Sequence, residues 1–198
     1  MARLRGRDDT RSAIAVHAAR LMAQDGIEDY GLAKRKAAKQ LGIPDARSLP
    51  NNDEIDAALR EYHDIYRGGD HEQRIRTLRT HAIRAMRELA VFDPHLTGSV
   101  LSGIAGPYAA IHLQLFTDNA KAVELFLIDR NISYQTGQSR LYAGHETRLP
   151  PVYSIKVGDA DIELTVLDAR DLRAPLRATA EGRIIERVRL SAVEALLE

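Results

Sequence analysis

The sequence predicts an α+β protein, with an N-terminal helical region followed by a small mixed β-sheet with flanking helices. Two observations predict this class. Apolar residues recur at helical spacing through roughly the first 90 residues, and after Pro94 they fall into short runs or alternate with polar residues. Helices grouped before strands are typical of the α+β class. We therefore divide the chain into a helical region over residues 1–69 and an α/β module over residues 70–198.

Four helices are expected before Pro94, each with an identifiable start or end signal. In chain order they are a helix from Thr10 or Ser12 to Gly26, a helix from Tyr30 to Leu41 that stops at Gly42 before Pro44, a helix capped by Asn51 or Asn52 and broken at Gly68-Gly69-Asp70, and a helix from about His71 to Leu89. The basic residues before the first cap are interpreted as a frayed start. Together these segments account for the helical region and lead into the module.

Short strands dominate the rest of the chain. The expected elements are strands over residues 96–101 and 111–116, a short helix capped by Asn119, a strand over 134–141, a hairpin of strands 152–157 and 162–167 turning at Gly158-Asp159, a loop over 168–182 and a last helix from about Arg183 or Ser191 to Leu197. This order of strand, strand, helix, strand and hairpin describes a small sheet with helices packed on it.

The composition excludes several classes of protein. The chain has no cysteine, which rules out disulfides, thiolate nucleophiles and cysteine zinc sites. Lysine plus arginine equals aspartate plus glutamate, 28 each, so no global charge attracts the chain to nucleic acid or to a membrane surface. No apolar run approaches the ~18 residues that a membrane-spanning helix needs. We expect a cytoplasmic protein that does not associate with membranes.

The small-residue segment from Gly98 to the apolar run at Leu113 has the composition of a phosphate-handling loop. Gly98-Ser99 opens it, and Gly103 follows before the strand that begins at Ile111. Small residues allow a phosphate to approach the backbone, whose N–H groups can then bind the anion. The segment therefore predicts a phosphate site.

This segment resembles the signature of the minimal nucleotidyltransferases of the DNA polymerase β superfamily. That family carries Gly-Ser, a second glycine about five residues after the first, and an Asp-x-Asp motif that begins about twelve residues after the first. Gly98-Ser99 and Gly103 match the glycines, but the two aspartate positions hold Ala110 and His112. The family's third carboxylate lies on a later strand, where Glu163 is the best match. The resemblance covers residues 70–170.

The resemblance implies a nucleotidyltransferase-like protein whose metal site has degenerated, acting in nucleotide, nucleic-acid or protein binding or in regulation. Any remaining catalysis would involve Glu163 and His112, with Mg or Mn bound with a nucleotide triphosphate as cofactor. Apart from the resemblance, Asp161 and Glu163 share one face of their strand, so they are either a pair of metal ligands or the solvated side of a hairpin. Ser99 would orient the triphosphate. Arg84 is close enough in sequence to the loop to contact a bound phosphate. Because magnesium prefers oxygen ligands, we expect magnesium-dependent transfer to be absent or altered.

Two other functions remain open. In the first, the chain is an interaction module without a nucleotide, and the glycines serve turns only. In the second, it is a helix-turn-helix DNA-binding regulator, because the basic helix containing Lys34, Lys36 and Lys39 ends at Gly42. Only the residues from Asp45 to Leu49 lie between two prolines after that turn, which is too short for a recognition helix. A partner is therefore expected to be a nucleotide or a protein.

Overall fold

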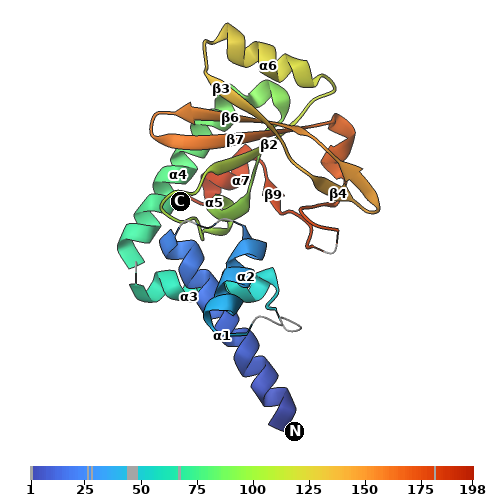
Figure 1. Cartoon of the computed structure of the whole chain (residues 1–198). Coiled ribbons are helices and arrows are strands. Elements are labelled where there is room, and N and C mark those ends of the chain that lie inside the picture. The colour runs from blue at the N-terminus through green and yellow to red at the C-terminus, as the bar shows by residue number, and fades with distance from the viewer. Residues whose placement is uncertain (1, 26, 28, 44–48, 67, 181) are drawn as a thin grey trace. The chain divides into compact units, whose positions relative to one another are not determined.

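The computed structural model describes residues 2–25, 27, 29–43, 49–66, 68–180 and 182–198. The predicted α+β class is confirmed: helices come first, and a mixed six-stranded sheet and a small antiparallel sheet follow (Figure 1). The chain forms two compact units, one made of Met1–Arg74 and Ile104–Ala109, the other of Ile75–Gly103 and Ala110–Glu198. The division falls inside the fourth helix, after Arg74.

Within the described residues, four helices contribute to the first unit. They are α1 (Ala2–Asp25), α2 (Tyr30–Gln40), α3 (Asn52–Tyr66) and the beginning of α4 (Gly68–Glu88). α1 begins well before the predicted cap at Thr10 or Ser12, because the alanine, leucine and arginines of the N-terminal stretch favour helix and no proline interrupts them. Gly26 and Pro44, two of the end signals in the sequence, lie outside the described residues.

Side chains cap α2 and α3 at their N-termini. The carboxylate of Asp29 accepts a hydrogen bond from the backbone N–H of Leu32 at 2.9 Å. The side chain of Asn51 accepts from the N–H of Glu54 at 2.9 Å, and the Glu54 carboxylate accepts from the N–H of Asn51 at 2.6 Å. This reciprocal pair is a capping box, and it satisfies two backbone donors that the first turn of a helix would otherwise leave without partners.

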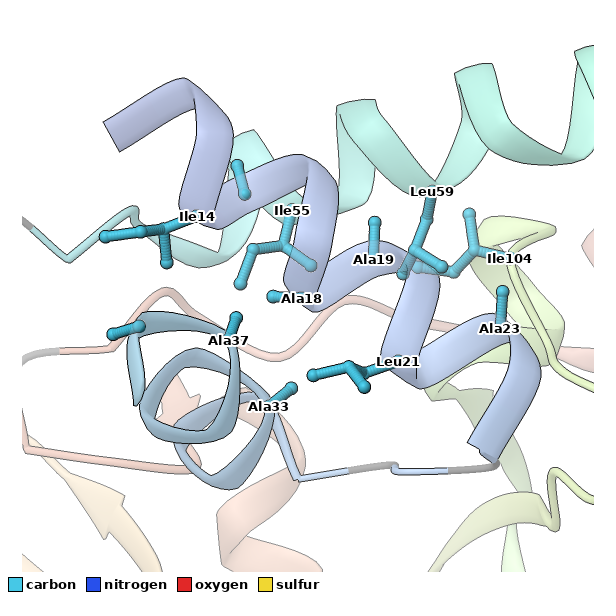
Figure 2. Close-up of a cluster of buried hydrophobic side chains, with 12 residues drawn as sticks. Ile14, Ala18, Ala19, Leu21, Ala23, Ala33, Ala37, Ile55, Leu59 and Ile104 are labelled. Atoms are coloured by element: carbon cyan, nitrogen blue, oxygen red, sulfur yellow. The ribbon is translucent and has the colours of Figure 1, made fainter. Parts of the chain in front are cut away.

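The core of the first unit is rich in alanine. Figure 2 shows the buried side chains of α1, α2 and α3 directed toward one another, and Ala18, Ala33 and Ala37 are completely buried. Their small side chains let the helix axes approach closely, since the distance between packed helices depends on the residues at the contact. Ile14 and Ile55 contribute the larger apolar surface.

Enlarging one of these alanines should therefore destabilise the first unit. We expect Ala37→Leu to cost about 1–3 kcal/mol, because the added methylenes have no space at a position with no exposed surface. Ala57→Leu, at an exposed position of α3, is the matched control and should change stability by less than about 0.5 kcal/mol. Urea unfolding of both variants measures the difference, and equal stabilities would contradict the close packing.

The second unit contains the strands and the remaining helices. After the rest of α4 come the 3₁₀-helix η1 (Ala90–Phe92), β1 (His95–Thr97), α5 (Gly98–Ser102), β2 (Ile111–Phe116), α6 (Ala120–Asp129), β3 (Tyr134–Gln138), β4 (Leu141–Ala143), β5 (Glu146–Arg148), β6 (Pro151–Val157), β7 (Ala160–Leu167), the 3₁₀-helix η2 (Ala169–Arg173), β8 (Leu176–Arg177), β9 (Arg187–Val188) and α7 (Leu190–Ala195). None of the described helices is long and apolar enough to cross a membrane.

The main sheet has the strand order β3-β6-β7-β2-β1-β9. Only the central pair, β2 and β7, runs parallel, and every other neighbouring pair is antiparallel. A second sheet of order β5-β4-β8 is entirely antiparallel. The hairpin predicted at Gly158-Asp159 is confirmed as β6 and β7, and Gly158 adopts a φ of 64° in the turn.

The two faces of the main sheet differ in character because side chains alternate along each strand. One face carries the core of the unit, with Ile111, Leu113, Ile162 and Leu164 almost completely buried. The other face carries His112 and Gln114 on β2. Phe116 and Leu167, at the far ends of β2 and β7, pack with Leu141 and Leu176 of the second sheet. The polar face is therefore covered at one end of the strands, and it is half exposed at the end where His112 lies.

The strand predicted over residues 96–101 is wrong beyond Thr97. β1 ends there, and Gly98 begins the short helix α5. Gly98 has a φ of 74°, a left-handed conformation that does not continue a strand, so the apolar residues that follow belong to a helical turn. The strand predicted over 134–141 is divided into β3 and β4, and Ser139 between them donates its N–H to the Pro150 carbonyl at 3.0 Å.

Candidate functional site

The candidate site begins at the turn from β1 into α5. Gly98 opens α5, Ser99 follows in the first turn, and Gly103 ends the helix with a φ of 79°. The backbone N–H of Gly103 donates to the carbonyl of Ser99, and the Ser102 hydroxyl lies 3.3 Å from the carbonyl of Gly98. The predicted loop residues are thus held together in one compact helical turn.

The register of the sheet sets His112 beside Glu163. β2 and β7 are parallel and pair His112 with Glu163, so the two side chains leave the same face of neighbouring strands. The His112 Nδ1 atom lies 3.2 Å from the Glu163 Oε2 atom. A carboxylate only accepts hydrogen bonds, so Nδ1 carries the proton in this pair. About a third of the His112 side chain and about two fifths of that of Glu163 are exposed, at 32% and 43%.

Gly98 lies directly against the His112 ring. A Cβ atom at Gly98 would be 3.2 Å from Cδ2 of His112, which is closer than ordinary van der Waals contact. The hydroxyl of Thr97, one residue earlier, donates to the His112 carbonyl at 3.3 Å. The start of α5 and the polar pair on β2 and β7 therefore form one continuous site in the second unit.

The other predicted site residues take different positions. Asp161 is exposed on β7 and forms an ion pair with Lys156 of β6 at 3.6 Å. Arg84 is exposed on α4. The arginine of α4 that reaches α5 is instead Arg79, whose guanidinium donates to the carbonyls of Val100 and Leu101 at 3.3 and 3.1 Å.

Two further residues on this side of the sheet were not singled out from the sequence. Gln114, two positions after His112 on β2, is only 4% exposed, and Arg187 of β9 pairs in register with Thr97. The Arg187 guanidinium lies 3.4 Å from the Gln114 side-chain oxygen and donates to the carbonyl of Leu172 at 2.6 Å. The alternation of polar and apolar residues along β2 predicts that Gln114 lies on the same face as His112. Nothing in the sequence near Arg187 indicates its hydrogen-bond partners.

The residues present do not fit the magnesium site that the resemblance implies. Ala110 has no ligating atom, His112 offers nitrogen where magnesium prefers oxygen, and the Glu163 carboxylate is engaged by His112. Among the described residues, no group of three or more histidine, aspartate or glutamate side chains could hold a metal ion.

The basic cluster considered for nucleic-acid binding is partly neutralised within the chain. Lys36 forms an ion pair with Asp25 at 2.9 Å, and the Lys34 ammonium donates to the Asn52 side chain at 2.6 Å. α3 begins with acidic residues in its first turn, Asp53 and Glu54. Of the segment between the two prolines, residues 45–48 lie outside the described residues.

The contact with His112 holds the pKa of the Glu163 carboxyl below its usual range, against an opposing effect of burial. A carboxyl with a lowered folded-state pKa stabilises the fold above its unfolded-state value of about 4.3, and this stabilisation is lost as the pH falls through the folded-state pKa. We expect Glu163→Gln to lose less stability than the wild type when the pH is lowered from 5 to 3. Urea unfolding across this range measures the two slopes.

A control variant separates the His112 contact from other acid effects. His112→Ala should raise the pKa of Glu163 toward its ordinary value, because the largest cause of the lowered value is removed. Carbon-detected NMR titration of the Glu163 carboxyl reads this directly. An unchanged titration midpoint in His112→Ala would contradict the pairing.

Comparison with known proteins adds no relative from which a function could be transferred. No protein-family model, no curated protein and no solved structure matches this chain.

Proposed function

We propose that the second unit is a nucleotidyltransferase-like module that binds a nucleotide triphosphate and acts in binding or regulation, without metal-dependent transfer. The observation that carries this proposal is the contact of His112 with Glu163 across two parallel strands, directly beside Gly98. These are the positions that the resemblance assigns to the metal-binding residues and to the Gly-Ser turn.

The side chains present favour binding over transfer. Two-metal transfer requires carboxylates that converge on divalent ions, which clamp the attacking and leaving oxygens. Here Ala110 and His112 stand at the positions of two of these carboxylates. The third carboxylate, that of Glu163, is in contact with the His112 imidazole. Gly98 and Ser99 keep small side chains at the start of α5, where a phosphate needs room to approach the backbone.

Thermal unfolding with ATP, GTP, CTP or UTP tests the proposal. A ligand at about 100 times its Kd stabilises the folded state by about 2.7 kcal/mol, which corresponds to a rise in Tm of roughly 5–10 °C for a chain of this size. We expect such a rise with at least one triphosphate. A radiolabelled transfer assay with magnesium or manganese should show no product, and vigorous metal-dependent transfer would contradict the proposal.

A matched pair of variants locates the ligand. Ser99→Asp adds a negative charge at the second residue of α5, where it would repel a phosphate, and should abolish the rise in Tm. Ser191→Asp makes the same change at the second residue of α7 and should leave the rise intact. Equal shifts in both variants, or no shift with any triphosphate in the wild type, would exclude this site.

One observation favours an interaction module without a nucleotide as the second candidate. Gly98 and Gly103 both have positive φ angles, so each glycine has a backbone reason to be present that does not involve a ligand. This candidate predicts that all four triphosphates leave Tm unchanged, and the same thermal measurement distinguishes the two functions.

A further inference from the structure

The outward face of α6 carries exposed apolar side chains flanked by charges. Val123 and Leu127 on the inner face are completely buried, whereas Leu125 and Ile128 are 57% and 52% exposed. Lys121 and Asp129, both exposed, lie four residues before and four residues after Leu125. Residues spaced by four lie on the same side of a helix, so Lys121, Leu125 and Asp129 form one row, with Ile128 beside it. We call these four residues the α6 stripe.

The two charged side chains of the α6 stripe, Lys121 and Asp129, have no ion-pair partner among the residues that the structure describes. Asp129 is the last residue of α6, where a carboxylate faces the negative end of the helix dipole at a cost, and the guanidinium of the next residue, Arg130, lies over the Phe126 ring, 4.1 Å from its centroid. An external cation opposite Asp129 would remove this cost.

We propose that the α6 stripe binds the α6 stripe of a second copy of this chain, with the two helices antiparallel around a twofold axis near Leu125. In this arrangement Leu125 and Ile128 of both copies are removed from water. Lys121 of each copy lies opposite Asp129 of the other, because the two residues are equally far from the axis, about 6 Å along the helix. A twofold interface uses the same surface on both copies, so one self-complementary row is sufficient.

The charges determine the orientation of the two helices. A parallel pair would oppose Lys121 to Lys121 and Asp129 to Asp129, and both contacts would be repulsive. The antiparallel pair replaces two repulsions with two attractions. The α6 stripe is therefore complementary to itself in one orientation only.

The size of α6 limits the strength of this association. Ten residues span about 15 Å, so the two helices alone bury less surface than the 1,200–2,000 Å² of a standard stable interface. The dimer is thus a weak one that forms at high protein concentration. Its ion pairs are exposed, so added salt weakens it.

Sedimentation equilibrium on the full chain, from micromolar to millimolar concentration, tests this proposal. We expect a monomer–dimer equilibrium in the wild type and a monomer at all concentrations in Leu125→Glu, which sets two negative charges against each other at the axis. Leu149→Glu, at a side chain that is 51% exposed outside the stripe, should dimerise like the wild type. A wild-type chain that stays monomeric throughout, or an undisturbed dimer in Leu125→Glu, would overturn the proposal.

Charge exchange tests the orientation of the helices. Lys121→Glu and Asp129→Lys should each weaken the dimer by about tenfold, because each turns two attractive pairs into repulsive ones. The double variant Lys121→Glu/Asp129→Lys restores opposite charges and should return the dissociation constant to within about threefold of the wild type. Failure of the double variant to recover, with both single variants weakened, would overturn the antiparallel pairing.

Discussion

Gly98→Val should destabilise the protein by about 1.5–3.5 kcal/mol, one of the two largest losses that we expect from a single substitution. A left-handed conformation costs an ordinary L-residue about 1–2 kcal/mol, and a β-branched side chain tolerates it least. Gly98 has a φ of 74°, and a Cβ atom there would press on the His112 ring at 3.2 Å. Displacing that ring from its rotamer adds about 0.5–1.5 kcal/mol. Guanidinium unfolding measures the sum.

A second glycine separates the two causes. Gly144 also has a positive φ, 62°, but a Cβ atom there would meet nothing within 4 Å. Gly144→Val should therefore show the backbone cost alone, and Gly98→Val should exceed it. Because the excess comes from the His112 ring, it should shrink when His112→Ala is combined with Gly98→Val. Equal losses at the two glycines would show that the ring contact contributes nothing.

Elements whose signals lie within the element itself could be predicted from the sequence. The apolar alternation of β2 fixed its span, 111–116, and the Asn119 side chain caps α6 by accepting from the N–H of Lys121 at 3.1 Å. The hairpin of β6 and β7 was predicted because Gly158 supplies the positive φ of a tight turn between two alternating runs. In each case local backbone preference and burial favour the same structure, so a single sequence is sufficient.

Elements that depend on distant partners could not be predicted in the same way. The apolar residues of α5 are compatible with a strand or with a helical turn. The helical turn forms because Gly98 adopts a left-handed conformation against the His112 ring of a neighbouring strand. β9 is only two residues long and exists because Leu96 and Thr97 of β1 pair with it. Arg187 on this strand finds its carbonyl partners in η2 and the residue after it, which no pattern around Arg187 indicates.

The candidate site shows the same division. The spacing of the motif that the sequence resembles, counted from Gly98, led to His112. The apolar residues around Glu163 predicted the strand on which it lies. The contact between them depends on β2 and β7 being parallel neighbours in one particular register. A shift of one residue in that register would turn one of the two side chains to the opposite face of the sheet. The hydrogen bonds of Arg79 to α5 could not be predicted, because Arg79 donates to the backbone carbonyls of Val100 and Leu101. Every residue has a backbone carbonyl, so the sequence carries no signal for such a partner.

The central strand that carries Glu163 is the other position where a large effect is expected. Leu164 follows Glu163 on β7 and points to the opposite face, where it is completely buried between its register partners, Leu113 of β2 and Tyr153 of β6. Leu164→Ala should cost about 2–5 kcal/mol, since the lost apolar contacts are joined by a cavity that a paired central strand cannot close. Leu149→Ala, at an exposed position, should cost less than about 0.5 kcal/mol.

The same variant tests how the polar pair depends on the core beneath it. If the β2–β7 register is held mainly by its buried face, Leu164→Ala should lower the free energy of unfolding and leave the pKa of Glu163 where the His112 contact holds it, because backbone pairing survives the loss of one side chain. Urea unfolding and the carboxyl titration, measured on one sample, give both quantities. A Glu163 pKa that returns to its ordinary value in Leu164→Ala would mean that packing at this single position maintains the His112–Glu163 geometry.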